Sequence, residues 1–320
     1  MRSKNALPAG RANAATRSDV DRCVGCLVGL AVGDALGTTL EFKPKGTFAP
    51  IDDMVGGGPF RLDPGQWTDD TAMALCLAQS LVERRGFDAA DQMRRYVRWW
   101  REGYPSSRPG DCFDIGRTVK TALASFERTG NPYAGSTDAL SAGNGSLMRL
   151  APIPVFYRSD AAAAVVHAAL SSKTTHGAAE AIDACRYYAA LIVGALRGES
   201  KEALASDLYA PDGVDWAAHP VSPKIRAIAK GSYKGRPASS IRATGYVVHT
   251  LEAALWAFHE SWSFEEGALL AVNLGEDADT TGAVFGQLAG AFYGASAIPL
   301  EWRRKLRDAE VIATLATALA

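Results

Sequence analysis

The sequence lacks the features of several protein classes. It has only five cysteines among 320 residues, too few and too scattered for the disulfide framework of a small secreted domain. Its formal net charge of -1 gives no general attraction to nucleic acid or to an anionic membrane. It also lacks the apolar leader of a secreted protein. These absences favour a cytoplasmic protein without nucleic-acid or membrane partners.

The composition suits a folded globular protein. Hydrophobic residues make up 48% and charged residues 22% of the chain, and a chain this long buries a sizeable core as one or two domains. Residues 1–18 contain basic side chains and no acid. Because they have no apolar periodicity, we predict a flexible tail at 1–18 rather than an organelle-targeting leader, and a single domain at 19–320.

Helical periodicity dominates the chain, and alternating strand patterns are nearly absent. The pattern predicts helices at 20–36, 71–85, 89–103, 115–128, 160–175, 177–198, 243–261 and 281–294. Loops rich in glycine and proline are expected at 43–66, 103–113, 129–145 and 209–240. We therefore predict an all-α, single compact multi-helix domain with its functional residues on the loops.

Two of these helices carry glycine at every fourth position. Gly25, Gly29, Gly33 and Gly37 follow one another in the first helix, and Gly282, Gly286, Gly290 and Gly294 in the last. Glycine inside a helix costs about 1 kcal/mol relative to alanine, so such stripes indicate that another backbone comes very close. We expect the two helices to touch or to share a neighbour. The acids beside them, Asp34 and Glu41 on one and Asp277 and Asp279 on the other, would then converge.

Cys23 and Cys26 form a CxxC within the first helix. No second pair accompanies them, so we predict buried thiols rather than a zinc or redox site. The glycine stripe of this helix is also compatible with a membrane span. The run is short for a span and contains Asp34, which favours a buried helix of a globular protein.

Two acidic clusters stand directly before predicted helices, one with the order T-D-D and the other with the order D-x-D-T. Their members are Thr68, Asp69 and Asp70 in the first and Asp277, Asp279 and Thr280 in the second. Each cluster alone is explained by helix capping. Four aspartates in one place would repel unless cations neutralise them. If the clusters meet, their oxygen ligands favour Mg²⁺ or Mn²⁺, or else Ca²⁺, over zinc, and a pair of ions is a common hydrolytic arrangement.

Five stretches together resemble the ADP-ribosylglycohydrolase family: GCLVGLAVGDALGTTLEF, WTDDTAMAL, GNGSLMRLAPI, THGAAEAIDACRYYAALI and NLGEDADTTGAVFGQLAGAFYG. The resemblance runs over residues 20–295, and the T-D-D and D-x-D-T pair is its most specific part. It implies an all-α fold with a central cleft that holds two divalent metal ions, Mg²⁺ or Mn²⁺.

The resemblance assigns roles to individual residues. It implies two metal-ligand sets, Thr68, Asp69, Asp70 and Asp277, Asp279, Thr280. It places Glu41 near the metals and the substrate. Backbone N–H groups of Asn144, Gly145 and Ser146 would hold the diphosphate of ADP-ribose, a task that suits a glycine turn before a helix.

Three further residues match the family pattern while keeping a structural interpretation. His176 corresponds to a histidine near the ribose or adenine, and is equally well explained as a capping or core histidine. Tyr246 resembles a tyrosine near the ligand or is a buried core residue. Asp114 corresponds to another acid near the metals or has a loop role.

The implied reaction is hydrolysis of the glycosidic bond between ADP-ribose and an acceptor, with arginine on a protein as the expected acceptor and a small conjugate as the other. Its transition state resembles an oxocarbenium ion. The candidate catalytic acids are Glu41, Asp69, Asp277 and Asp114, and the sequence does not decide which is the base. Two alternatives remain at this point, a two-metal nucleotide phosphohydrolase and a non-catalytic ADP-ribose-binding protein.

Overall fold

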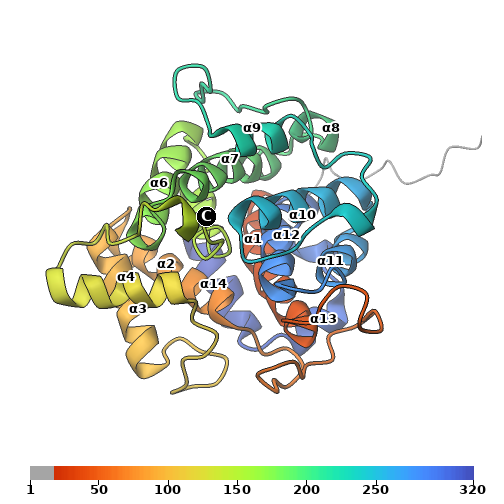
Figure 1. The fold of residues 1–320 in the computed structure, drawn as a ribbon, viewed down its shortest axis with the longest axis horizontal. Coiled ribbons are helices and arrows are strands. Elements are labelled where there is room, and N and C mark those ends of the chain that lie inside the picture. The colour runs from red at the N-terminus through yellow and green to blue at the C-terminus, as the bar shows by residue number, and fades with distance from the viewer. Residues whose placement is uncertain (1–17) are drawn as a thin grey trace, which may run out of the picture.

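The structure is a computed structural model that describes residues 18–320. The tail predicted at 1–18 therefore lies, except for Ser18, outside the described residues. Within 18–320 the chain forms helices and loops without a β-strand, which confirms the predicted all-α fold (Figure 1).

The α-helices follow one another along the described chain with mostly short connections. They are α1 Asp19–Gly37, α2 Asp69–Arg84, α3 Ala89–Glu102, α4 Arg117–Thr129, α5 Pro152–Phe156, α6 Ala161–Thr175, α7 Ala179–Leu196, α8 Lys201–Leu204, α9 Pro223–Ala229, α10 Val247–Glu260, α11 Phe264–Val272, α12 Ala278–Tyr293, α13 Leu300–Lys305 and α14 Ala309–Leu319. Short 3-10 helices are η1 Thr38–Leu40, η2 Ala139–Ser141, η3 Ala238–Ser240 and η4 Ala295–Ala297.

Every helix predicted from periodicity is present, with ends shifted by a few residues. The segment 209–240, predicted as a loop, contains α9, and the sequence interpretation also missed α5, α8, α11, α13 and α14. Two of these helices begin with a proline, Pro223 in α9 and Pro152 in α5. Proline fits the first turn of a helix because its missing N–H has no partner there, so a residue taken as a loop signal marks a helix start here.

The glycine stripes of α1 and α12 face each other at the centre of the molecule. A Cβ added at Gly29 would lie 2.3 Å from the carbonyl oxygen of Gly286, and one added at Gly286 would lie 1.9 Å from that of Gly29. The same contact repeats one turn away in each direction, between Gly25 and Gly290 and between Gly33 and Gly282. The two backbones therefore touch directly, which confirms the contact expected from the stripes.

The order of these contacts shows that the two helices run antiparallel. Each turn forward along α1 pairs with one turn backward along α12, and the last contact joins Gly37 to the backbone of Ala278 and Asp279. Figure 1 shows α2, α3 and α4 on one side of the pair and α11 and α13 on the other. The C-terminus of α1 and the N-terminus of α12 therefore meet at the same place.

By length and composition alone, the segment Asp19–Leu40 would also satisfy the test for a membrane span. Within the structure, 94% of its most apolar window is buried, and the partner of its glycine face is another helix of the same chain. This burial supports its interpretation as the core helix of a globular fold.

The cysteines of the CxxC stripe also belong to the core. Cys23 and Cys26 are fully buried, and all five cysteines are free thiols. Burial raises the pKa of both Cys23 and Cys26, so the neutral thiol is favoured. These observations agree with the prediction of buried thiols.

Candidate active site

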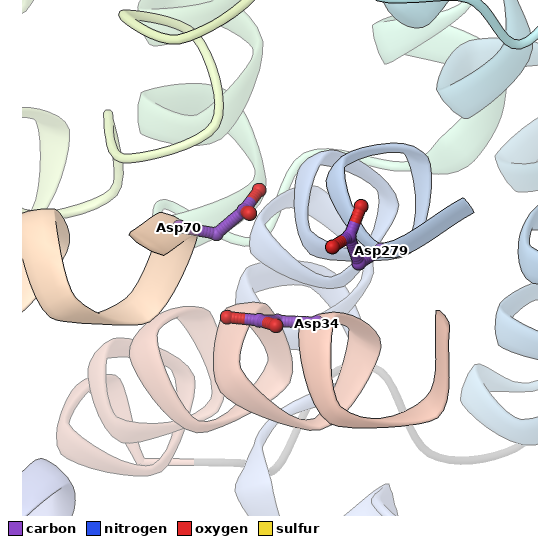
Figure 2. A group of neighbouring side chains, drawn as sticks. All are labelled: Asp34, Asp70 and Asp279. Atoms are coloured by element: carbon purple, nitrogen blue, oxygen red, sulfur yellow. The ribbon is translucent and has the colours of Figure 1, made fainter. Parts of the chain in front are cut away.

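Two carboxylate clusters form where α1, α2 and α12 meet. Oxygens of Asp34, Asp70 and Asp279 all lie within 4.8 Å of one another. Figure 2 shows these three side chains pointing into the space between the helices, Asp34 from α1, Asp70 from α2 and Asp279 from α12. Oxygens of Glu41, Asp277 and Asp279 meet the same distance criterion. Asp279 belongs to both clusters, so the predicted convergence of the two acidic segments is confirmed.

Asp34 holds the N-terminus of α2 in place. Its carboxylate accepts hydrogen bonds from the backbone N–H of Thr68 at 2.9 Å and of Thr71 at 3.0 Å, and from the hydroxyls of both threonines. The first backbone N–H groups of a helix have no partner inside that helix. Asp34 supplies the missing acceptor from a different helix, and so positions the T-D-D segment.

Glu41 has the corresponding role at α12. It follows η1 directly, and one of its carboxylate oxygens, Oε2, accepts the backbone N–H of Ala278 at 2.9 Å. The end of α1 thus supplies an acid to each of the two helices that carry the predicted metal ligands. This arrangement explains why both ligand segments are fixed relative to one another.

The acid cluster carries a large electrostatic cost as it stands. Burial, reinforced by Asp279, raises the pKa of Asp34 and of Asp277 to about 7 and that of Asp114 to about 10. Burial also raises the pKa of Glu41, of Asp69 and of Asp70, again with neighbouring carboxylates adding to the effect. Among the described residues, no lysine, arginine or histidine pairs with any of these acids.

The side chains fit divalent cations. Oδ1 of Asp70 is buried and has no hydrogen-bond partner among the described residues, although an unpaired buried carboxylate oxygen is costly. The surrounding donors are all oxygens, the ligands that Mg²⁺ and Mn²⁺ prefer. A cation is the partner that satisfies both the orphaned oxygen and the crowded charge.

The other predicted ligands surround the same space. The Thr68 hydroxyl lies 3.1 Å from Oδ2 of Asp70 and 3.5 Å from Oδ2 of Asp279. Asp69 and Thr280 are buried and line the cleft over the acids. Asp114 also lines this cleft, with a left-handed backbone at φ 61°. The structure therefore brings all six predicted metal ligands and all four predicted catalytic acids to one site.

A cleft of about 1070 Å³ leads to the acid cluster, and several of the acids line it. Its floor is acidic, one wall is formed by Gly143, Asn144 and Gly145, and another by residues 112–119. The amide nitrogen Nδ2 of Asn144 donates to Oδ2 of Asp277 at 2.7 Å and to the hydroxyl of Thr250 at 2.9 Å. Asn144 thus links the glycine loop to the second acidic segment.

Ser146 is buried, whereas Tyr246 is half-buried, and neither lines this cleft. The Ser146 hydroxyl is buried against the hydroxyl of Ser172 at 2.9 Å. The Tyr246 hydroxyl donates to Glu180 and accepts from Lys224, while its neighbour Gly245 lines the cleft. The Ser146 hydroxyl is therefore turned away from a ligand, and Tyr246 stands beside the cleft at Gly245.

His176 packs underneath the glycine loop. A Cβ at Gly145 would lie 2.8 Å from its Cε1 atom, and one at Gly143 would lie 3.3 Å from its Nε2 atom. Burial, together with the nearby Arg149, lowers the pKa of His176 to about 3, so its ring is neutral. The residue also ends α6, with its N–H bonded to the carbonyl of Ser172. Its two predicted roles, cleft residue and helix cap, are thus compatible with one position.

Arg149 is a functional candidate that the sequence interpretation missed. It is fully buried, donates to the carbonyl of Gly145 at 2.6 Å and to the hydroxyl of Thr175 at 2.8 Å, and has no carboxylate partner among the described residues. A buried cation without an acid places positive potential directly behind the glycine loop. The available signal was a lone arginine within the apolar stretch SLMRLAP.

Comparison with known proteins identifies close relatives over nearly the whole chain. The sequence model of the ADP-ribosylglycohydrolase family matches residues 15–320. The ADP-ribosylarginine hydrolase Tri1 of Pseudomonas putida is 46% identical over 300 residues, which cover 94% of this chain and 78% of the relative. The ADP-ribosyl-[dinitrogen reductase] glycohydrolase of Rhodospirillum rubrum is 32% identical over 290 residues, 89% of this chain and 90% of the relative.

A solved structure gives the same result for the fold. A chain of an ADP-ribosylglycohydrolase-related protein complex superimposes with a TM-score of 0.82 at 48% sequence identity, covering 94% of this chain and 97% of that one. Sequence and fold therefore identify the same family.

Proposed function

This chain belongs to the ADP-ribosylglycohydrolase family, and from that premise we propose that it removes ADP-ribose from arginine, on a protein or on a small conjugate. The bond cleaved joins C1 of the distal ribose to a guanidine nitrogen. Two relatives, at 46% and 42% identity, bear the name ADP-ribosylarginine hydrolase, which supports this acceptor. The observation that carries the proposal is the meeting of the two acidic segments around the unpaired oxygen of Asp70 in the cleft.

We assign two divalent cations, Mg²⁺ or Mn²⁺, to this acid cluster. Their ligands would come from the starts of α2 and α12: Thr68, Asp69, Asp70, Asp277, Asp279 and Thr280. Bound there, such ions neutralise the acids and act as Lewis acids toward the ribose hydroxyls and the attacking water. Asp34 is a positioning residue in this scheme, because its oxygens are already occupied by Thr68 and Thr71.

Glu41 is the proton acceptor that the geometry favours. It lines the cleft, and the bond from Ala278 occupies Oε2. Burial and the neighbouring Asp279 raise its pKa, so it would accept a proton from the attacking water at Oε1 only when cations neutralise the surrounding acids. The water oxygen bonds to C1, the bond from C1 to nitrogen breaks with its electron pair going to the guanidine, and that nitrogen takes up a proton. The products are ADP-ribose and arginine. Asp114 and Asp69 face the same space and complete the acidic surface around the ribose.

The glycine loop provides the site for the diphosphate. The N–H groups of Gly143 and Asn144 already donate to the carbonyls of Ser141 and Gly245. Of the predicted donors Asn144, Gly145 and Ser146, the N–H groups of Gly145 and Ser146 therefore remain for a phosphate, and Arg149 lies behind them as a buried positive charge without an acid partner among the described residues. The diphosphate carries the negative charge that this wall lacks. Asn144 fixes the distance between this wall and the acids through its bond to Asp277.

Free thiols at all five cysteines support a reducing, cytoplasmic location.

The proposal is tested with peptides that carry ADP-ribose on arginine or on serine, with ADP-ribose phosphodiesters as a third substrate. Mass spectrometry of the products, with and without a chelator, separates the linkages. We expect release of intact ADP-ribose from arginine, abolished by the chelator and restored by Mg²⁺ or Mn²⁺. Release of AMP would identify a phosphohydrolase, and binding without product over hours would identify a binding protein.

A further inference from the structure

Three residues with a strained backbone line the cleft. Phe42, Asp114 and Glu276 have φ values of 60°, 61° and 58°, in the left-handed region that glycine adopts most easily. All three line the cleft described above. A side chain kept in such a conformation costs about 1–3 kcal/mol and is found preferentially at functional sites. Asp114 belongs to the acids, whereas Phe42 and Glu276 have no role in the mechanism so far.

Phe42 and Glu276 are held next to each other. The N–H of Phe42 donates to the carbonyl of Glu276 at 2.7 Å, and the N–H of Glu276 donates to the carbonyl of Lys43 at 2.8 Å. Phe42 directly follows Glu41 and Glu276 directly precedes Asp277, so both side chains flank the acids around the reacting ribose. The phenyl ring of Phe42 is 64% exposed, an unusual position for a large apolar side chain beside a buried acid cluster.

The carboxylate of Glu276 is available to a ligand. Among the described residues its carboxylate receives no hydrogen bond and forms no ion pair. Lys45 and His249 lie close enough to interact with it electrostatically. Nζ of Lys45 donates instead to the carbonyls of Ala238 and Ile241, and Nδ1 of His249 lies against the hydroxyl of Thr244. An exposed ring and a carboxylate without a hydrogen-bond donor therefore stand side by side at the acids.

The same wall already holds the guanidinium of one of the protein's own arginines, Arg108, between an aromatic ring and a carboxylate. Phe42, Phe60 and Phe113 form an aromatic ridge, with ring centroids 6.3 Å apart between Phe42 and Phe60 and 5.5 Å apart between Phe60 and Phe113. At its far end Arg108 lies over the ring of Phe113 at 4.6 Å and donates to a carboxylate oxygen of Asp111 at 2.9 Å. At one end of the ridge, the face of the Phe113 ring and the carboxylate of Asp111 together hold the Arg108 guanidinium. At the other end, Phe42 and Glu276 offer the same combination of an aromatic ring and a carboxylate.

We propose that Phe42 and Glu276 form the acceptor subsite, which binds the guanidinium of the ADP-ribosylated arginine. The planar cation would stack on the Phe42 ring and donate to the Glu276 carboxylate. This inference rests on the proposed function and adds to it the residues that choose the acceptor. Phe42 and Glu276 select arginine over acceptors that lack a planar cation, such as serine, while the other walls bind ADP-ribose whatever the linkage.

The first test measures turnover in Phe42→Ala and Glu276→Gln, with Trp262→Ala and Glu301→Gln as controls that change an exposed aromatic and an exposed acid outside the cleft. We expect each cleft variant to raise KM for the arginine-linked peptide about tenfold. The inhibition constant of ADP-ribose, which lacks the acceptor, stays at the wild-type value, as do both controls. An equal rise of KM and of the inhibition constant, or no change in KM, overturns the subsite.

The Glu276→Gly variant separates the effect of the Glu276 side chain on acceptor binding from its effect on the stability of the fold. Because glycine relieves the strain at φ 58°, the midpoint of thermal unfolding is expected to stay level or to rise, while KM for the arginine-linked peptide rises as in Glu276→Gln. A wild-type KM in the glycine variant contradicts the proposal, because it would show that only the backbone of this residue matters.

A binding experiment tests the subsite without turnover. Agmatine, a small guanidinium compound, is titrated by calorimetry into the wild-type protein saturated with ADP-ribose, with butylamine as the non-planar cation control. We expect saturable agmatine binding that Phe42→Ala and Glu276→Gln abolish. Agmatine binding in a wild-type protein that cleaves no conjugate would sink the proposed function and leave the subsite intact. Cleavage of the arginine-linked peptide without agmatine binding, or with binding that ignores both substitutions, would sink the subsite alone.

Discussion

The α1–α12 pair and the cleft wall around Phe42 position functional groups in opposite ways. In the helix pair, backbone touches backbone at Gly29 and Gly286, so no side chain remains that can adjust. In the wall, Phe42 and Glu276 keep strained backbones and present their side chains to the cleft. The comparison teaches that Asp34, Asp277 and Asp279 are placed by the rigid pair, whereas the proposed acceptor subsite stands on loops.

The strongest way to break the comparison is to push the two helices apart. Gly286→Ala places a Cβ 1.9 Å from the carbonyl oxygen of Gly29, which neither helix can avoid without moving. We expect a loss of about 3–5 kcal/mol in the free energy of unfolding, or failure to fold. Chemical denaturation of the purified variant measures it.

Gly116→Ala is the control for an added Cβ, because this Cβ meets nothing within 4 Å. Gly116 is the N-cap of α4, where alanine is disfavoured, so we expect a loss of only about 1 kcal/mol. A Gly286→Ala protein of wild-type stability would show that α1 and α12 tolerate separation. It would contradict the view that this helix pair is rigid.

The next largest effect is expected from emptying or changing the acid cluster. A chelator removes the charge that balances the acids, so the midpoint of thermal unfolding falls and recovers on addition of Mg²⁺ or Mn²⁺. Asp70→Asn removes a ligand and part of the repulsion. It should abolish turnover, bring the metal-free protein to a stability at or above that of the metal-free wild type, and lose the metal-dependent shift. Differential scanning calorimetry with defined metal concentrations shows whether the shift depends on Asp70.

A smaller effect is expected from substitution of Asp34. Both of its oxygens already accept hydrogen bonds, so we expect it to position the metal ligands and not to bind a metal ion itself. Asn has one carbonyl oxygen in place of two carboxylate oxygens, so Asp34→Asn loses acceptors for Thr68 or Thr71. Substitution of groups that orient metal ligands costs about 10–100-fold in metal affinity or activity. Titration with Mn²⁺ followed by electron paramagnetic resonance measures this affinity. A loss as complete as in Asp70→Asn would make Asp34 a direct ligand.

The sequence predicted the rigid half of this comparison far better than the variable half. Glycine at every fourth position and acids at helix starts are periodic or local signals, so α1 and α12, their contact and the meeting of the two acidic segments could be inferred before any coordinates. The hydrogen bonds from Thr68 and Thr71 to Asp34 join residues 34 and 37 positions apart in the chain, and no local sequence pattern predicts them. Phe42 and Glu276 are functional candidates because of their backbone angles and exposure, which composition and periodicity do not contain.

An effect that appears only below neutral pH is a pH dependence carried by His176 under the glycine loop. Because its pKa is lowered to about 3 in the folded protein and is about 6.5 when unfolded, only the unfolded state takes up this proton between those values. The stabilising contribution is complete above pH 6.5 and falls by about 1.4 kcal/mol per pH unit as the pH drops toward 3. His176→Gln should show a correspondingly weaker loss of stability than the wild type between pH 6.5 and 4.5.

Urea denaturation across this pH range measures the difference between the two proteins. His219→Gln, a change at an exposed histidine, serves as the control and should follow the wild type. Parallel curves for wild type and His176→Gln would show that the ring under the loop titrates as it does in water.

The central claim is that the starts of α2 and α12 together hold divalent cations. Anomalous diffraction at the manganese edge, from crystals grown with Mn²⁺, tests it most directly. The account predicts two manganese peaks between the carboxylates of Asp70, Asp277 and Asp279, with the Asp70 Oδ1 atom among the ligands. Absence of manganese from this cluster at saturating Mn²⁺, in an enzyme that still releases ADP-ribose, would contradict it.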